Sequence, residues 1–253
     1  MAELCRKKAL YGIPNGFETF PEEEIPKVKI EVLDKLLAKQ IVQMDLDGKT
    51  VLADSAYQEL IDAICDCDAC LTVNYQLSAE RSEDVIFWRA ANGYLRADVT
   101  DGYYVFLSED ASGISAYFRT LTMKGRMPFE AKACTVPHIA LAKAKRDFAD
   151  GKENDAVRIL MQNGAETIAE TIIAGLKEEA DYLGLLLMVN RPNEKAPQQA
   201  AFLGAKEVLV SLSDTVQNYR NCTRFSACGE NDVSAKKRVF LEQFLVPETE
   251  DLT

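Results

Sequence analysis

The sequence of 253 residues is long enough for one large domain or two small ones, and its 47% hydrophobic and 27% charged residues are typical of a globular protein. The net charge of −11 disfavours binding to nucleic acid or to an anionic membrane, because both need patches of Lys and Arg. The longest apolar run, at 183–189, is far shorter than the ~20 residues that span a bilayer. No apolar region follows the basic N-terminal residues, as it would in a secretory signal. We therefore expect a cytoplasmic protein without membrane insertion.

The first half is predicted to begin with helices and to continue into an antiparallel meander. Apolar residues at helical spacing indicate a helix over 27–39, and Asp54 or Ser55, with Gln58, is typical of the start of a second helix. Beyond Cys70 the apolar period changes to two, as in a half-buried strand. Asn92-Gly93 and Asp101-Gly102 are strong hairpin signals, because these residues tolerate positive φ. We expect strands at 71–77, 85–90, 94–99 and 103–108, a charged loop at 78–84, and a short helix over 113–122 capped by Ser108 or Asp110.

The second half is predicted to repeat this order of elements. Helices are expected over 143–151 and 154–164, each ended by a glycine at the C′ position, and over 169–180. A strand at 183–190, a polar loop at 191–199 and two or three strands within 200–227 follow. Asn231 or Asp232 then caps a terminal helix over 233–245.

The distance between matching landmarks of the two halves changes little along the chain. Ala56 and Ala169 are 113 residues apart, Leu71 and Leu185 are 114 apart, and Pro128 and Pro247 are 119 apart. The interpretation we adopt is an α+β fold with two pseudo-symmetric halves, 1–128 and 129–253, each built as helices, antiparallel meander and helix. The halves are expected to form one compact unit with a shared central sheet, which would also hide two strand edges. Chance similarity of two α+β stretches is the alternative.

A cluster of cysteines at Cys65, Cys67 and Cys70 raises the question of a metal site. A zinc site needs four ligands, usually as two paired knuckles, and no second knuckle follows here. The corresponding stretch of the second half, 177–183, has neither Cys nor His, so the joint between helix and strand does not require thiols. We interpret the three residues as structural or incidental thiols, with a metal or redox site as the alternative, and expect no cofactor.

The single histidine restricts catalysis that depends on an imidazole. His138 follows Pro137 at a predicted helix start, which indicates a partly exposed residue of the first turn. Phosphate-binding, dinucleotide-binding and nucleophile-elbow motifs are absent from the sequence. Trp88, beside Phe87 in a predicted strand, is interpreted as a core residue, with an exposed interface anchor as the alternative. The sequence thus favours a protein that is not an enzyme.

One family is similar in the order of its elements. An N-terminal helix, a connecting D-x-D-G segment from Asp45 to Gly48, a helix, a strand at 71–77, a charged loop and a meander lead to a short helix before Pro128, and a looser second copy follows. This order resembles the EspG-type chaperones associated with type VII (ESX) secretion. The resemblance implies a cytosolic, pseudo-twofold, single-domain protein that binds folded helical substrate dimers before export. It transfers no individual binding residue.

The leading hypothesis is therefore a non-catalytic, cytoplasmic chaperone or adaptor whose partners are proteins, with small helical secreted proteins as candidates. Loops carried on a rigid scaffold are the usual place for function, and the two long polar loops are the candidate contacts. The candidate partner-binding residues are Glu80, Arg81, Asp84, Arg191, Asn193, Glu194 and Lys195. The first alternative is an immunity protein that neutralises a basic toxin through its acidic surface. The second is a thiol or metal protein centred on the cysteine cluster.

Overall fold

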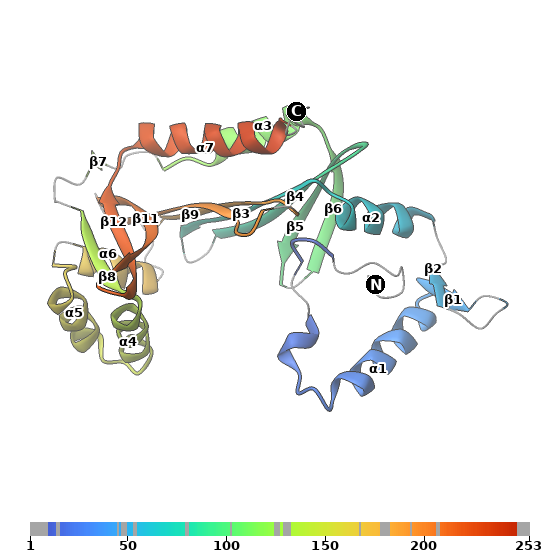
Figure 1. The fold of residues 1–253 in the computed structure, drawn as a ribbon, viewed down its shortest axis with the longest axis horizontal. Coiled ribbons are helices and arrows are strands. Elements are labelled where there is room, and N and C mark those ends of the chain that lie inside the picture. The colour runs from blue at the N-terminus through green and yellow to red at the C-terminus, as the bar shows by residue number, and fades with distance from the viewer. Residues whose placement is uncertain are drawn as a thin grey trace.

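The computed structural model describes residues 10–13, 16–44, 46, 50–52, 55–78, 81–101, 103–123, 127–128, 133–166, 168–177, 183–192, 194–205 and 208–246. Figure 1 shows helices on both sides of a long central sheet. The elements of the first half are η1 (Gly16–Thr19), α1 (Ile25–Ala38), β1 (Val42–Met44), β2 (Thr50–Leu52), α2 (Ser55–Cys65), β3 (Ala69–Ser78), β4 (Arg81–Ala90), β5 (Gly93–Thr100), β6 (Tyr103–Glu109) and α3 (Ala111–Thr120).

The elements of the second half are β7 (Met127–Pro128), β8 (Cys134–Pro137), α4 (His138–Ala149), α5 (Glu153–Gln162), α6 (Ala169–Leu176), β9 (Leu183–Asn190), β10 (Gln198–Ala205), β11 (Val208–Gln217), β12 (Arg220–Ala227) and α7 (Glu230–Leu245). This half has the same order of elements as the first from its helix α6 onward, and before that helix it contains β8 and α5 in place of the β1–β2 hairpin. Both predicted meanders are confirmed, and the second contains three strands after β9.

The two meanders join into one sheet, as the sequence predicted. Among the described residues the strands lie in the order β6-β5-β4-β3-β9-β10-β11-β12-β8, and all neighbours along this path are antiparallel. β7 pairs in parallel with the start of β11, beside that path. The β1–β2 hairpin is separate from the main sheet.

The halves are related by a local twofold axis at the junction of β3 and β9. Val73 pairs with Leu187 across this junction. Their separation, 187 − 73 = 114, is the offset between Leu71 and Leu185 in the sequence, so the axis passes between this pair. The helices obey the same relation: α2 packs on β4 as α6 packs on β10, and α3 follows β6 as α7 follows β12.

The sheet has two differently covered faces, which we call the α7 face and the α6 face. α3 and α7 cover the α7 face, where Leu71, Val73, Phe87 and Leu187 form the centre of the largest apolar core. On the α6 face, α4, α5 and α6 cover the second half and α2 covers the first (Figure 1). Trp88 is fully buried in the core under α2, which confirms its interpretation as a core residue.

Several local predictions are confirmed by the backbone. Asp110 caps α3 by accepting a hydrogen bond from the amide of Gly113 at 2.7 Å. Gly151 and Gly164 lie just beyond α4 and α5 with φ of 76° and 98°, which is the left-handed conformation expected at C′.

Three local predictions are wrong. The loop predicted at 78–84 is shorter, because β4 already begins at Arg81; the polar residues 82–84 pair with β3 and tolerate a strand whose face is open to solvent. The turn between β4 and β5 lies at residues 91–92 and not at the predicted Asn92-Gly93, since Ala90 pairs with Gly93. The cap of α7 is Gly229, earlier than expected, and Asp232 instead accepts a hydrogen bond from the Gly229 amide at 2.7 Å.

Candidate functional site

The predicted loop between β9 and β10 is anchored to the helix above it. Arg191 Nη1 lies 3.1 Å from Glu194 Oε1, and Arg191 Nη2 donates a hydrogen bond to the carbonyl oxygen of Gln243 at 2.8 Å. These contacts tie the loop to the last turn of α7. Lys195 is exposed, whereas Asn193 lies outside the described residues. Arg191 and Glu194 therefore have a structural role in addition to any contact with a partner.

The other predicted contact residues lie at the opposite end of the central strands. β4 begins at Arg81, and Glu80 lies outside the described residues. Cys70 pairs with Asn190 at one end of the β3–β9 junction and Gln76 with Gly184 at the other. Because Ser78, which pairs with Arg81, is eight positions beyond Cys70 along β3, the two ends of these strands are separated by roughly 25 Å. The structure does not bring them together.

Asp84 instead belongs to an open hollow on the α6 face. Its Oδ1 accepts a hydrogen bond from Asn74 Nδ2 at 2.6 Å, which links β4 to β3. The hollow has a volume of about 470 Å³ and lies over the central strands, between the regions covered by α2 and by α4–α6. Its lining combines polar residues of the first half with apolar residues of the second: Asn74, Gln76, Ser82, Asp84, Gly184, Leu186, Ala201, Leu203 and Leu212.

α1 exposes an apolar surface on the same side of the molecule. Apolar residues recur at helical spacing, yet none of the 14 residues of α1 is buried. Ile30 and Val32 are exposed, and the remaining large apolar residues of α1 are only half-buried. Figure 1 shows α1 extending away from the sheet on the side of the α6 face. Its counterpart α4 packs against α5 and β12. α1 is thus an amphipathic arm whose large apolar side chains are exposed or only half-buried in the described part of the chain.

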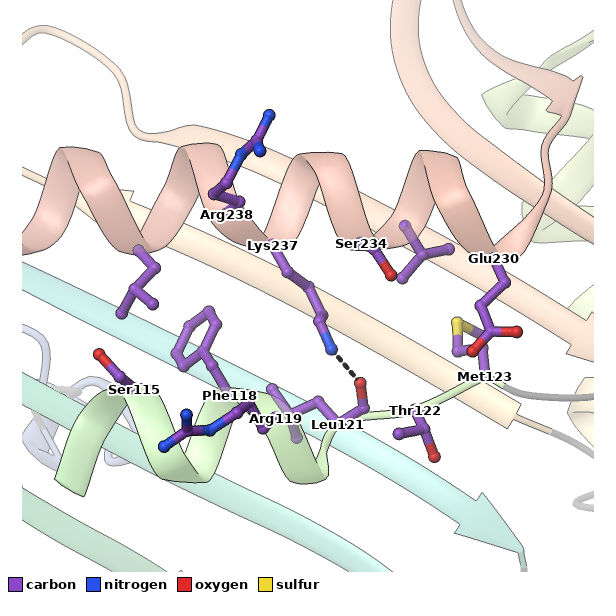
Figure 2. A pocket seen from close by; sticks show the side chains of 12 residues that line it. Ser115, Phe118, Arg119, Leu121, Thr122, Met123, Glu230, Ser234, Lys237 and Arg238 are labelled. Carbon is purple, nitrogen blue, oxygen red and sulfur yellow. Dashed lines mark hydrogen bonds between the residues drawn. The ribbon is translucent and has the colours of Figure 1, made fainter. Parts of the chain in front are cut away.

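A second hollow, of about 340 Å³, lies between α3 and α7 on the opposite face of the sheet (Figure 2). The Lys237 ammonium donates a hydrogen bond to the carbonyl oxygen of Leu121, at the end of α3. Burial lowers the pKa of Lys237, since desolvation disfavours its charged form. Arg238 extends away from α3. The polar contact in this hollow therefore connects the two helices and does not form a catalytic constellation.

The cysteine cluster forms part of the core beneath α2. Cys67 and Cys70 are buried, and burial raises the pKa of each thiol to about 12. A zinc ligand must be a thiolate, which these surroundings disfavour. Within the described part of the chain, no group of three or more Cys, His, Asp and Glu residues is arranged to hold a metal ion.

The histidine occupies the position that the sequence predicted. His138 is the first residue of α4, and its side chain is 46% exposed. Its Nε2 lies 3.4 Å from Asp214 Oδ1, on the exposed surface of β11. In the described part of the chain, no hydrogen bond joins the His138 imidazole to a cysteine or serine side chain that it could activate as a general base.

Comparisons with known proteins found a similar solved structure. No protein-family model matches the chain, and no curated protein matches it. Among solved structures, the chain is similar to the Mycobacterium tuberculosis type VII secretion system chaperone EspG5, which was determined in complex with a PE25–PPE41 dimer. The TM-score is 0.47, the sequence identity 11%, and the match covers 98% of this chain and 94% of that one. In the described residues, no helix is both long and apolar enough to cross a membrane.

Sequence reasoning missed the central hollow and the exposure of α1. The helical spacing of apolar residues in α1 was visible, but the same pattern occurs in α4, which packs against its neighbours. The hollow was marked only by polar residues at alternate positions of β3, such as Asn74 and Gln76. That alternation predicts an uncovered sheet face.

Proposed function

We propose that the protein is a non-catalytic chaperone or adaptor that binds another protein on the α6 face. The observation that carries this proposal is the arm α1, which presents an apolar face with no buried residue beside an open sheet. Exposed apolar patches of this kind mark protein-interaction sites, since covering them removes apolar area from water.

The partner that suits this surface is helical. A helix that lies between α1 and the α4–α6 layer can pack its apolar side against Val32 of α1 and Leu186 of the hollow, as in helix-in-groove recognition. Asn74 and Asp84 supply an amide and a carboxylate at the floor of the hollow. Their polar atoms can fix the orientation of such a helix, while the apolar contacts supply most of the affinity.

The specific partners that we propose are dimeric helical substrates of a type VII secretion system, bound in the cytoplasm. This follows the resemblance in element order, and the similar EspG5 structure holds a PE25–PPE41 dimer. The net charge of −11 suits a carrier that keeps its cargo in solution, because a highly charged surface favours solubility.

Co-expression with a helical dimeric secretion substrate of the host organism tests the proposal. We expect a complex that co-elutes in size-exclusion chromatography and keeps the substrate soluble. Ile30→Asp and Val32→Asp should weaken binding roughly tenfold or more, because each places a carboxylate in the apolar contact. Val239→Asp is the matched control, since Val239 is exposed to the same extent as Val32 but lies on α7, which covers the opposite face of the sheet. A well-folded protein that forms no complex, or forms it equally with the α1 variants, would contradict the proposal.

The loop residues named from the sequence remain proposed contacts. Substituting Arg191 or Glu194 would also loosen the attachment to α7, so these positions give ambiguous results. Lys195→Glu and Asp84→Ala are more informative, because Lys195 is exposed and the Asp84 hydrogen bond is at the surface. Loss of binding in Lys195→Glu but not in Asp84→Ala would place the partner at the β9–β10 loop. The reverse result would place it over the hollow.

A further inference from the structure

β6 forms an uncovered end of the sheet. It pairs with β5 on one side, and no described residue pairs with its outer side. Its sequence YYVFLSE begins with five consecutive apolar residues. Tyr103, Val105 and Leu107 point to the α7 face and are 76%, 55% and 45% exposed. The edge strand thus combines free backbone hydrogen-bonding groups with an exposed apolar stripe.

The usual protections of an edge strand are absent from β6. Natural edges carry Lys, Pro or a bulge that blocks further pairing. β6 has no Lys, Arg or Pro, and its pairing with β5 runs without a register shift. Its counterpart β12 has exposed Arg220 and Arg224, and β8 pairs with its outer side. The counterpart strands β12 and β6 therefore differ: β8 pairs with the outer side of β12, whereas no strand of the described residues pairs with the outer side of β6.

We propose that a second copy of this chain covers β6, through antiparallel pairing of β6 with β6 around a twofold axis at Val105. Two identical strands related by a twofold axis perpendicular to the sheet are necessarily antiparallel, as β8 and β12 are. In this register Tyr103 of each copy faces Leu107 of the other, and the two Val105 side chains face each other. The three exposed side chains of each copy form one apolar ladder on the α7 face.

The distribution of charge favours β6 as the contact between copies. Each copy has a net charge of −11, so two copies repel unless they meet at an uncharged surface. Between Tyr103 and Ser108 the strand has no charged residue. Glu109 of each copy lies opposite Asp101 of the other, at the two ends of the pair. Added salt screens this repulsion and should therefore strengthen the dimer.

The proposed dimer is independent of partner binding on the α6 face. The hollow extends from β4 across β3 and β9 to β10 and β11, and β5 separates it from β6. The two strand spacings from β4 to β6 amount to about 10 Å. A dimer would thus carry two open hollows in one continuous sheet.

Analytical ultracentrifugation of the full chain, at micromolar to tens of micromolar concentrations, tests the proposal. We expect a monomer–dimer equilibrium that shifts toward dimer with added salt. Val105→Lys places two ammonium groups opposite each other at the axis and should raise the dimer dissociation constant on the order of 100-fold. Leu107→Lys should act in the same direction. Val216→Lys is the matched control, since Val216 is 68% exposed on the interior strand β11 and should leave the dimer intact.

A cysteine variant tests the register separately. In Val105→Cys the two introduced thiols face each other, so mild oxidation should give a cross-linked dimer, whereas Val216→Cys should remain uncross-linked. Far-UV circular dichroism verifies that each variant is folded. A chain that stays monomeric throughout, forms open-ended assemblies, or keeps its dimer in both lysine variants would overturn the proposal.

Discussion

The buried guanidinium of Arg89, on β4, donates a hydrogen bond from Nη1 to the carbonyl oxygen of Phe244, in the last turn of α7. A helix leaves its last four carbonyl groups without partners of its own. Three consecutive ones are satisfied here by other elements: Gln243 by Arg191, Phe244 by Arg89 and Leu245 by the Tyr94 hydroxyl. Two cations at this end also complement the partial negative charge of the helix C-terminus. The terminal helix is thus fixed to both halves of the sheet.

Replacing Arg89 by Met should destabilise the protein strongly. The substitution leaves the carbonyl of Phe244 buried without a donor and breaks the 2.7 Å contact of Arg89 with Asp68. We expect the free energy of unfolding to fall by about 3 kcal/mol, as urea denaturation would measure. Arg158→Met is the control, because Arg158 pairs with Asp155 on the exposed surface of α5. It should lower the free energy of unfolding by less than about 1 kcal/mol. Equal losses in the two variants would contradict the role given to Arg89.

Gly12→Ala should displace the N-terminal segment from the core under α2. Gly12 has φ of 79°, and a Cβ at this position would lie 2.4 Å from Cys70 Sγ. The adjacent carbonyl of Tyr11 accepts a hydrogen bond from Trp88 Nε1 at 2.6 Å. Because Trp88 is the only tryptophan of the chain, its fluorescence reports the displacement directly, and we expect a red shift with a stability loss of about 1–2 kcal/mol. Gly16→Ala, where a Cβ meets nothing within 4 Å, should leave the spectrum unchanged.

Alkaline pH should destabilise the fold through the buried thiols. Burial raises the pKa of Cys70 to about 12, whereas a thiol in the unfolded chain ionises near its ordinary value, about 8.5. The unfolded state therefore releases a proton that the folded state retains. The stabilisation that the Cys70 thiol contributes is fully present below the pKa of the unfolded state and is lost as the pH rises toward 12. We expect a loss of about 2 kcal/mol from Cys70 between pH 8 and pH 10, measured by urea denaturation at both pH values.

The control for this pH dependence is another cysteine of the same cluster. Cys70→Ala should flatten the decline of stability between pH 8 and pH 10, although it also removes buried volume at every pH. Cys65, at the end of α2, is only half-buried, so Cys65→Ala should leave the decline as steep as in the parent protein. A decline that is equally steep in Cys70→Ala would assign it to other groups.

The fold could be predicted well from the sequence because most of the signals are local and because the order of elements occurs twice. The sequence predicted two similar halves with a shared sheet, and the structure adds that the sheets join where Val73 pairs with Leu187, 114 residues apart. Capping by Asp110 and termination at Gly151 were predictable, because both depend on the chemistry of a single turn.

The candidate site was less predictable because it depends on which surfaces remain uncovered. The apolar residues of α1 predict an amphipathic helix, but the pattern is the same whether Val32 is covered or exposed. Loop length was a poor guide as well. Arg191 lies in a long polar loop, yet its guanidinium holds the end of α7, 52 residues away in the sequence. Such a contact between distant segments has no local sequence signal.

The turn between β11 and β12 gives the last prediction. The second meander lacks Asn-Gly and Asp-Gly, yet Gln217 pairs with Arg220 across a two-residue loop, with Asn218 and Tyr219 at φ of 50° and 59°. Tyr219 is fully exposed, so no contact compensates for its left-handed backbone, whereas asparagine tolerates this conformation. Tyr219→Gly relieves the strain but adds freedom to the unfolded chain, and we expect a net gain of about 0.5–1 kcal/mol in thermal or urea denaturation. Asn218→Gly should change stability less. A loss of stability in Tyr219→Gly would show that the tyrosine side chain contributes to the fold.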